Sequence, residues 1–425
     1  MNTSVSISDF SQRSPLRATL VWGLAAFFYF YELMLLVSTS VMLDDLSLAF
    51  TANAEQLGSV AAYYYYAYAI MQIPVGLLMD RFGPKILLTC AALLCVLGCV
   101  IFGMAPVLWV AKLGRFVMGV GGSFAVVGCL KLSFLWFPTN RFALLTGLMV
   151  AVGMMGAAFG QEPVALLVMA VGWRQAAFIG AGIGFLSAVA IWCVVRDQPH
   201  TSMTLFSKTQ TVRFFSGLYL IMKDPQAWIV SLYAGLMFVP TTGFGQLWGV
   251  PYFIERYQID KPAAGLMVSM IFFGWAVGGP LYGWLSDKMG RRRLPMGFAA
   301  LSTLCVISAI MYLPLSALQM KIAMFLLGLF SSGFIIAFSL VREINAPLLT
   351  GTAIGFVNTL NNASGALAQP IVGKLLDAQL EASGHANYTL PMYNEAFLFL
   401  PACILLAFLT IPFIRETFCR QRQAP

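Results

Sequence analysis

The chain alternates long apolar runs with short polar connections. Most of these runs approach or exceed the ~20 residues that a helix needs to cross the hydrocarbon of a bilayer. Backbone groups in hydrocarbon must be hydrogen-bonded within their own segment, so each run is predicted to be a helix. The fold class predicted is an all-α membrane protein with 12 transmembrane helices in two six-helix bundles. The runs lie at residues 18–42, 56–79, 85–105, 107–136, 142–167, 173–195, 226–253, 263–285, 294–314, 317–341, 350–376 and 394–414.

A duplicated motif divides the runs into two sets of six. Gly76–Lys85 reads GLLMDRFGPK and Gly283–Arg292 reads GWLSDKMGRR, an offset of 283 − 76 = 207 residues. A repeat of this length indicates two similar halves instead of a solenoid. We therefore expect an N-terminal bundle at 1–195, a cytoplasmic linker at 196–225, and a C-terminal bundle with a cytoplasmic tail at 226–425.

Composition supports a membrane protein and indicates its orientation. Hydrophobic residues make up 60% of the chain and charged residues 10%, against about 25% charged residues in soluble proteins. The net charge of +8 comes from Lys and Arg in the connections, most of them on the side that holds both termini. This bias predicts cytoplasmic termini, whereas nucleic-acid binding is not expected. The first 15 residues are polar and the first apolar run is too long for a signal peptide, so we expect that run to be retained.

Residues suited to metal or covalent chemistry are few. The eight cysteines lie in apolar runs or the tail without metal-ligand spacing, and there are two histidines. We therefore expect no disulfide framework, metal site or cofactor. We see no nucleophile–base–orienter pattern either, so we predict that the protein is not an enzyme.

The repeated loop motif resembles the signature of the major facilitator superfamily between its helices 2 and 3 and between helices 8 and 9. Two further patterns strengthen the resemblance, namely Arg115 followed by closely spaced glycines up to Gly122, and Gly172-Trp173-Arg174 before helix 6. The resemblance implies two six-helix bundles around a central cavity, transport by alternating access, and loop motifs that gate the cytoplasmic side. The gating residues implied are Gly76, Asp80, Arg81, Gly83, Asp287 and Arg291.

A narrower resemblance concerns the cargo. Phe28–Glu32, Trp248–Tyr252, and Gly355–Asn358 through Gln369-Pro370 are similar to the phagosomal nutrient transporters of intracellular bacteria and to the lysosomal dipeptide-transporter branch. This implies import of amino acids, nucleosides or peptides, and a bacterial inner membrane as the location. It also brings Tyr29 into the candidate site.

Ionisable residues inside apolar runs are costly, by roughly 2.5–3.5 kcal/mol, and are functional candidates by default. Glu32 is expected either to bind a substrate ammonium group or coupling proton, or to accept a hydrogen bond from a tyrosine or another helix. Arg115 is expected either to support coupling or anion binding, or to satisfy helix carbonyls as a packing partner. Glu162, before Pro163, is expected to act in a gate or ion pair or to snorkel outward.

Polar and aromatic side chains complete the candidate site. Tyr64 and Tyr68 are the i,i+4 pair expected to reach it, whereas the other tyrosines of that run would pack or anchor at the interface. Pro240 and the glycines near Gln246 suggest a broken helix, with Trp248 after it as either an outer-gate or a belt aromatic. One polar helical face, formed by Asn358, Asn362, Gly365 and Gln369, is expected to line an aqueous pathway or to hydrogen-bond between helices.

These patterns lead to one functional prediction and several alternatives. No nucleotide-binding motif is present, so a gradient is the expected driving force. Glu32 makes a proton the expected co-substrate, and simple facilitated diffusion stays as an alternative. Glu32 and Arg115 would suit a zwitterion, which favours an amino acid or small peptide carried by a monomer. Nucleoside or polycarboxylate and siderophore uptake, multidrug efflux by antiport, and a non-transporting receptor stay as alternatives. The missing Gly-Pro pair in helix 5 speaks against efflux.

Overall fold

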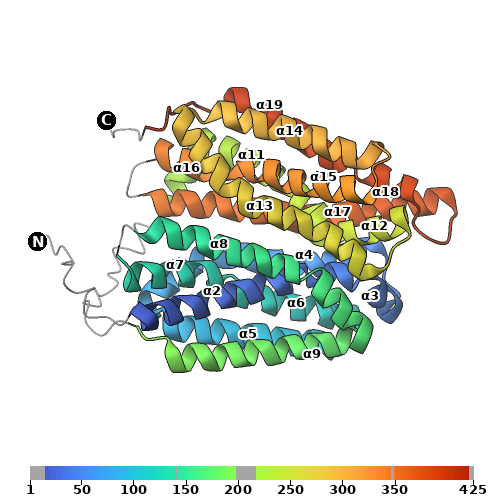
Figure 1. The fold of residues 1–425 in the computed structure, drawn as a ribbon, viewed down its shortest axis with the longest axis horizontal. Coiled ribbons are helices and arrows are strands. Elements are labelled where there is room, and N and C mark those ends of the chain that lie inside the picture. The colour runs from blue at the N-terminus through green and yellow to red at the C-terminus, as the bar shows by residue number, and fades with distance from the viewer. Residues whose placement is uncertain (1–14, 139–140, 198–216, 346–348, 421–425) are drawn as a thin grey trace, which may run out of the picture.

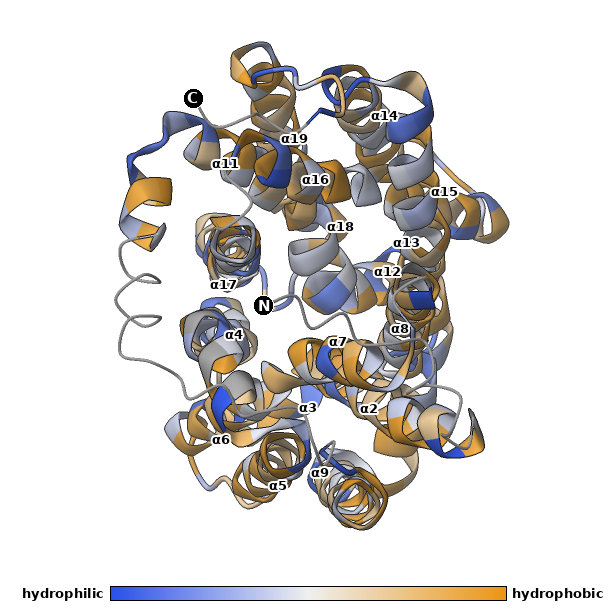
Figure 2. Ribbon diagram, turned by 90° about the vertical axis from the view of Figure 1, so that its left-hand side faces the viewer, coloured by the Kyte–Doolittle hydropathy of each residue, from blue (hydrophilic) through white to orange (hydrophobic). Residues whose placement is uncertain are grey.

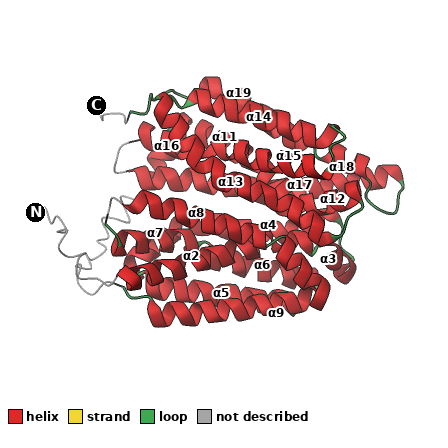
Figure 3. Ribbon diagram, in the orientation of Figure 1, coloured by secondary structure: helices red, strands yellow, loops and turns green. Residues whose placement is uncertain are grey.

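The structure is a computed structural model that describes residues 15–138, 141–197, 217–345 and 349–420. Within these ranges the chain is helical with short connections and contains no strand (Figure 3). The central part of the predicted linker, residues 198–216, lies outside the described residues.

The first bundle is built from helices α2 to α9. Short 3₁₀ or amphipathic segments follow the first long helix, and the remaining elements are long. Its elements are α2 (Pro15–Val37), η1 (Ser38–Val41), α3 (Leu43–Phe50), α4 (Ala54–Phe82), α5 (Pro84–Gly103), α6 (Leu108–Gly122), α7 (Phe124–Trp136), α8 (Phe142–Phe159) and α9 (Glu162–Val194).

The second bundle follows the same plan from α11 to α19. Its elements are α11 (Pro225–Val239), η3 (Pro240–Trp248), α12 (Gly249–Tyr257), α13 (Lys261–Met289), α14 (Arg293–Tyr312), α15 (Ala317–Ser331), η4 (Ser332–Ile335), α16 (Ile336–Ile344), α17 (Thr350–Ser383), α18 (Leu390–Ala396), α19 (Phe399–Thr410) and η6 (Ile411–Phe413).

The described elements combine into the twelve spanning rods that the sequence predicts. Within the described ranges, nine stretches are long and apolar enough to cross a bilayer. One of them, Leu144–Val194, contains two rods, because Gly172 has a φ of 81° and breaks α9. α4 and α17 are also long, at 29 and 34 residues, but carry more polar side chains. They lie among the other rods and complete the set.

The two bundles lie side by side, the first below the second in Figure 1. α4 packs along α17, while α8 and the start of α9 pack against α13. If the rods are numbered one to six within each bundle, the second rod of the first bundle packs on the fifth rod of the second bundle. The fifth rod of the first bundle likewise packs on the second rod of the second bundle. The interface therefore has the pseudo-twofold character expected of a duplicated transporter fold.

Both ends of the described chain lie at one end of the molecule, on the left in Figure 1. We call this the terminal end and the opposite one the far end. Viewed from the terminal end, the outward helices carry mostly hydrophobic residues (Figure 2). Large exposed apolar side chains such as Phe185, Leu186 and Phe298 would form unusually wide patches on a soluble protein, but they suit contact with lipid.

Candidate functional site

Glu32 lies inside the first bundle, in the C-terminal third of α2, with its side chain buried. The Tyr64 hydroxyl of α4 donates to Glu32 Oε1 at 2.8 Å, whereas Oε2 has no partner among the described residues. Gly122 faces this pair, and a Cβ there would come within 2.7 Å of Glu32 Cγ. The glycine expected from the helix 4 pattern therefore makes room for the carboxyl group.

Arg115 is buried beside Glu32 but forms no ion pair with it. Its guanidinium donates to the carbonyl oxygens of Leu35 at 2.7 Å and Leu36 at 2.8 Å, at the C-terminal end of α2. A cation is favourable at this position because the last carbonyls of a helix carry partial negative charge. The guanidinium also lies over the Tyr64 ring, 4.8 Å from its centroid. Tyr64 thus links Glu32 and Arg115, the two charges that the sequence singled out.

The run of tyrosines on α4 divides between two environments. Tyr64 faces Glu32, and the predicted partner Tyr68 stacks on Tyr64 with ring centroids 6.5 Å apart. Tyr29 is buried one turn before Glu32 and packs against Gly153. Tyr65, which the sequence analysis did not single out, points the other way and donates to Gln246 Oε1 of the second bundle.

Amide side chains form a second contact between the bundles. Asn358 Nδ2 on α17 donates to Gln72 Oε1 on α4 at 2.9 Å. Asn362 Nδ2 donates to the Asn358 carbonyl at 2.8 Å. The polar face predicted on this helix is therefore directed towards the other bundle, at least at Asn358.

Helix seven is broken, as Pro240 and the nearby glycines predicted. Residues Pro240–Trp248 form a π-helix, η3, between α11 and α12. Gln369 on α17 supports this segment, because its Nε2 donates to the Thr242 carbonyl at 3.0 Å. In return, Trp248 Nε1 donates to the Gln369 carbonyl at 2.9 Å. Gln369 and Trp248 are buried inside the second bundle, where they hold the broken helix in place.

Gln161 joins the two bundles near the far end, although the sequence analysis passed over it. The Ser40 hydroxyl donates to Gln161 Oε1 at 2.9 Å, and Gln161 Nε2 donates to the Gly245 carbonyl of η3 at 3.3 Å. Glu162, the charged neighbour that drew attention instead, is only partly buried at the start of α9. The charge of Glu162 drew attention to this part of the sequence. The neutral neighbour Gln161 is the more deeply buried of the two residues.

A set of contacts that we call the far-end latch closes the interface at that end. Asp377 on α17 accepts from the backbone N–H of Ala54 at 3.0 Å and of Glu55 at 2.8 Å, the first residues of α4. The Tyr388 hydroxyl donates to Asp377 as well, at 2.6 Å. A carboxylate at a helix N-terminus pairs with the unsatisfied amides and with the helix dipole.

Two close backbone approaches complete the far-end latch. A Cβ on Gly58 would lie 2.5 Å from the Gln369 carbonyl oxygen, and Gly373 packs against the backbone of Ala54. On the other side of the interface, Lys261 pairs with Asp45 at 2.7 Å. These contacts bring α4 to α17, and α13 to the start of α3, at the far end.

The first copy of the loop motif lies at the terminal end. Gly83 has a φ of 78°, which favours glycine, and separates α4 from α5. Asp197, just after α9, packs against Gly83 and accepts from the Lys85 N–H at 2.9 Å. Arg81 is exposed beside the Phe82 ring. The side chain of Asp80 lies outside the described part of the chain.

A groove opens beside this loop. It has about 690 Å³ of empty space, open solvent included, and is lined by Gly76 and Met79 of α4, residues of α7 including Lys131, and Phe142 of α8. No neighbouring atom lies within 4 Å of a Cβ placed on Gly76. The terminal end of the first bundle is therefore more open here than the far end of the interface.

The second copy of the motif is held by Arg292. This buried guanidinium donates to Asp287 at 2.7 Å and makes two hydrogen bonds to Glu343 of α16. Burial disfavours the charged form of Arg292. The hydrogen bonds that Arg292 donates to Glu343 and Asp287 outweigh this effect and raise the pKa of Arg292 above its usual value. Arg291, the residue expected from the motif, is exposed, so the contact with Asp287 belongs to its neighbour.

An acidic residue after the last helix of each bundle returns to the third helix of that bundle. Glu416 accepts from the N–H groups of Arg292 at 2.8 Å and Arg293 at 2.9 Å, where α14 begins. Burial opposes the charge on Glu416, but these backbone bonds dominate and lower its pKa. Asp197 makes the corresponding contact with α5 in the first bundle.

Similarity to known proteins identifies the family of this chain. A family model described as "Major Facilitator Superfamily" matches residues 21–369 and 241–418. The chain belongs to the major facilitator superfamily. The prediction made from its loop motifs is confirmed, and so is the twelve-helix fold.

Relatives within the superfamily carry different cargoes. The lysosomal dipeptide transporter MFSD1 of Danio rerio is 26% identical over 79% of this chain and 73% of its own length. SauU of Cupriavidus necator, named as a probable sulfoacetate transporter, is 25% identical over 73% of this chain and 76% of its own length.

A solved structure matches nearly the whole fold of this superfamily member. A bacterial homologue of the human lysosomal transporter Spinster, in an inward-facing and unoccupied conformation, has a TM-score of 0.75 at 16% identity and covers 95% of this chain and 96% of its own. The family and these relatives are transporters, so this multi-pass membrane protein is a transporter and not an enzyme.

Proposed function

We propose that the protein imports a small polar nutrient, an amino acid or small peptide, by alternating access and with a coupled proton. The observation that carries this proposal is the pair of polar contacts across the bundle interface, Tyr65 to Gln246 and Asn358 to Gln72. Side-chain hydrogen bonds between moving halves must break and re-form during transport. While these bonds are broken, their donors and acceptors are free to bind a cargo.

The chemistry of these contacts favours a cargo rich in both donors and acceptors. Amide side chains provide one carbonyl acceptor and two N–H donors each, and a phenol provides both functions. Asn362 extends the same polar set along α17. A peptide or amino acid matches such neutral groups, whereas a polyanion needs several cations. The dipeptide transporters among the relatives support the same class of cargo.

We assign the coupling proton to Glu32. It is buried, half of its carboxyl group is unpaired, and its only described hydrogen-bond partner is Tyr64. Tyr64 and Tyr65 are consecutive on α4, with one facing Glu32 and the other facing Gln246 of the second bundle. A change in the protonation of Glu32 therefore acts on a helix that also carries a cargo contact. Arg115 contributes by holding the end of α2 and the Tyr64 ring.

The gates follow from the two ends of the interface. With the termini cytoplasmic, as the distribution of Lys and Arg predicts, the far-end latch is the outer gate and Gln161 and Glu162 lie beside it. The two motif copies, with Gly76, Asp80, Arg81 and Gly83 at the end of α4 and Asp287 and Arg291 at the end of α13, form the inner gate. We place the protein in a bacterial inner membrane as a monomer, with residues 196–225 as a cytoplasmic linker.

A two-stage experiment tests this proposal. Thermal unfolding of the purified protein is first measured with amino acids, dipeptides, nucleosides and sulfoacetate, because a ligand at 100 times its Kd stabilises the native state by about 2.7 kcal/mol. Uptake of the stabilising compound into proteoliposomes is then measured with and without an inward proton gradient.

Two variants separate the proton from the cargo. Glu32→Gln should retain the ligand-induced stabilisation but lose the response of uptake to the proton gradient. Tyr65→Phe removes the hydroxyl that contacts Gln246 and should weaken cargo binding while keeping the response to pH. Full pH-driven uptake by Glu32→Gln would remove Glu32 from coupling. Stabilisation by sulfoacetate and by no dipeptide or amino acid would replace the proposed cargo with a small organic anion.

A further inference from the structure

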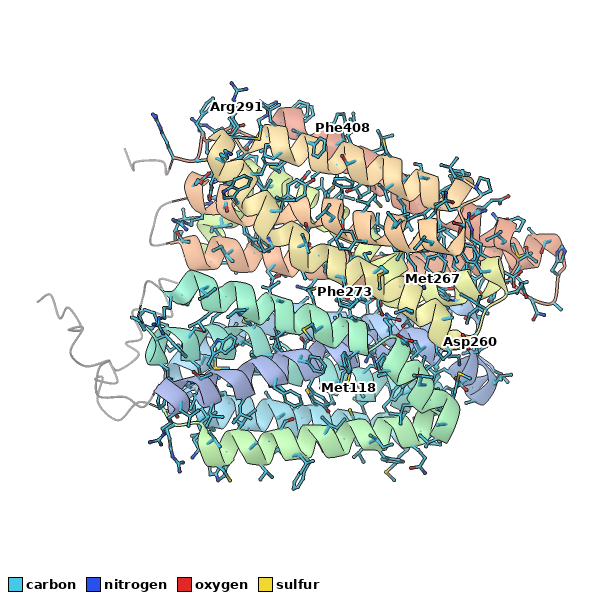
Figure 4. All side chains as sticks on the ribbon, in the orientation of Figure 1. Met118, Asp260, Met267, Phe273, Arg291 and Phe408 are labelled. Carbon is cyan, nitrogen blue, oxygen red and sulfur yellow. The ribbon has the colours of Figure 1, made fainter. Side chains whose placement is uncertain are left out.

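The first bundle contains a cavity that is separate from the bundle interface. It lies between α2, η1, α5, α6 and α9 and has about 550 Å³ of empty space, a volume that includes the part open to the outside. Its lining includes Leu35 and Thr39 from the end of the first rod, Cys99 from α5, and Met118 from α6, which is labelled in Figure 4. The proposed transport pathway uses none of this space.

The walls of this cavity are mostly apolar, and Arg115 is their one charged residue beside the hydroxyl residues Ser38 and Thr39. Arg115 lines it, with its side chain almost entirely buried. Its two terminal nitrogens donate to the carbonyls of Leu35 and Leu36, but Nε has no partner among the described residues. A buried donor without an acceptor is costly, by roughly 1–3 kcal/mol. Arg115, a permanent cation that lines this cavity, therefore keeps an unmet N–H group.

The cavity reaches the lipid-facing surface along α9. Ile179 lines it and is 41% exposed, and Leu167 and Ile183 line it while only partly buried. α9 runs along the outer edge of the first bundle in Figure 2. The neighbouring exposed side chains Phe185 and Leu186 are apolar. A molecule dissolved in the bilayer can therefore reach the mouth of the cavity without crossing water.

The lipid outside the mouth of the cavity restricts the type of ligand. Moving an alkyl chain from lipid into an apolar cavity gains little hydrophobic free energy, because lipid tails are as apolar as the cavity walls. Binding must therefore depend on the polar end of the ligand. An oxygen acceptor that reaches Arg115 Nε supplies the missing hydrogen bond, and a carboxyl group does so with opposite charge.

We propose that this cavity binds a single-chain carboxylic acid from the bilayer, with its carboxyl oxygen on Arg115 Nε and its chain leaving beside Ile179. The site is distinct from the cargo pathway and does not depend on the identity of the cargo.

Photolabelling of the full-length protein in lipid nanodiscs tests this site. The probe is a medium-chain fatty acid with a diazirine group near its methyl end, and labelled peptides are identified by mass spectrometry. Labelling is expected on α5, α6 and α9. It should be displaced by the unlabelled fatty acid but not by an alkylamine of the same length, which has no acceptor when protonated and is repelled by Arg115. Equal displacement by both competitors would overturn the proposed role of Arg115.

A matched pair of glycines on α9 tests the location. A Cβ on Gly180 meets only Leu35 and Cys99, at 3.6 and 3.9 Å, so a leucine side chain there extends into the cavity. Gly182 has nothing within 4 Å and is exposed. Gly180→Leu should reduce labelling by about tenfold or more, equivalent to 1.4 kcal/mol, and Gly182→Leu should leave it unchanged.

A second filling variant guards against misfolding of the first. Ala177 also lines the cavity, and Ala177→Leu should reduce labelling in the same way. Thermal unfolding of each variant identifies any that is not folded. Undiminished labelling in a folded variant of either kind, or labelling spread over all lipid-facing helices, would overturn the proposal.

Discussion

Removal of the Asp377 carboxylate should open the far end of the bundle interface. Asp377 accepts from the first two amides of α4 and from Tyr388, so one side chain of the second bundle caps a helix of the first. The two bonds to the α4 amides exist only while the far end is closed, because Asp377 and α4 belong to halves that separate there. Asp377→Ala therefore destabilises the closed state, while the Tyr388 bond that it also removes is internal to the second bundle.

The size of this effect follows from known capping energies. Loss of a capping side chain costs about 0.5–2 kcal/mol. A carboxylate at a helix N-terminus contributes about 0.3–1 kcal/mol, and up to ~2 kcal/mol when partly buried. Asp377 is buried, which favours the upper part of this range, and its bond to Tyr388 lies within the second bundle and does not add to the closing energy. A loss of about 1–2 kcal/mol shifts the ratio of closed to open molecules about 5- to 30-fold towards open.

Thiol accessibility measures this shift. Thr242 is buried beneath the latch, beside Gly365 and Gln369, and Thr242→Cys is the reporter in a protein whose other cysteines are replaced. A membrane-impermeant thiol reagent is applied to the far side, and the labelling rate is compared with and without Asp377→Ala. The rate should rise 5- to 30-fold if labelling follows the open population.

Asp44→Ala is the matched control, since it removes another acidic side chain from the far end. Asp44 lies 3.8 Å from Lys261 and is largely exposed, while Asp45 keeps the closer contact with the same lysine at 2.7 Å. An exposed pair of this kind contributes about 0–1 kcal/mol. Equal labelling rates in Asp377→Ala and Asp44→Ala would show that the helix cap does not control closure.

Three further variants test other contacts. Gly58→Ala places a Cβ 2.5 Å from the Gln369 carbonyl oxygen, so it should separate α4 from α17 and raise the same labelling rate; an unchanged rate would refute the close packing. Gln161→Leu removes the hydrogen bonds to the Gly245 carbonyl and to Ser40, which keeps its bond to the Val37 carbonyl. It should lower stability by roughly 0.5–1.5 kcal/mol per lost bond, measured by thermal unfolding, whereas a neutral result would exclude a structural role. Glu416→Gln should lower stability at neutral pH by roughly 0.5–2 kcal/mol. The folded-state pKa of Glu416 is lowered. Its contribution to the free energy of unfolding is therefore present above the usual Glu pKa of about 4.3 and is lost as pH falls below that value. A difference in melting temperature between wild type and variant that stays constant through this pH range would contradict the assignment.

The sequence predicted the architecture well because the bilayer restricts it so strongly. Long apolar runs with internally satisfied backbones leave few alternatives to a helical bundle. The break at Pro240–Trp248 was also predictable, because Pro and Gly weaken a helix locally. Glu32 and Arg115 stood out for the same reason, as rare charges in apolar runs.

The contacts between helices were not predictable to the same degree. Tyr65 was passed over because four consecutive tyrosines give no sign of which one reaches the other bundle. Gln161 was overlooked because it is neutral and its neighbour Glu162 is charged. Arg291, Arg292 and Arg293 are identical in type, and only the approach of Glu343 and Glu416 makes Arg292 the buried one. Such pairings depend on residues far apart in sequence.

The returning acids Asp197 and Glu416 bear on how the protein is handled in the laboratory. Each fastens the trailing segment of one bundle to the start of that bundle's third helix. A truncation that removes Glu416 frees the start of α14 and the loop before it, even though every spanning helix is intact. Affinity tags and fluorescent fusions therefore belong beyond Arg420, and a protein shortened to residue 414 should express as a membrane protein with a loosened second half.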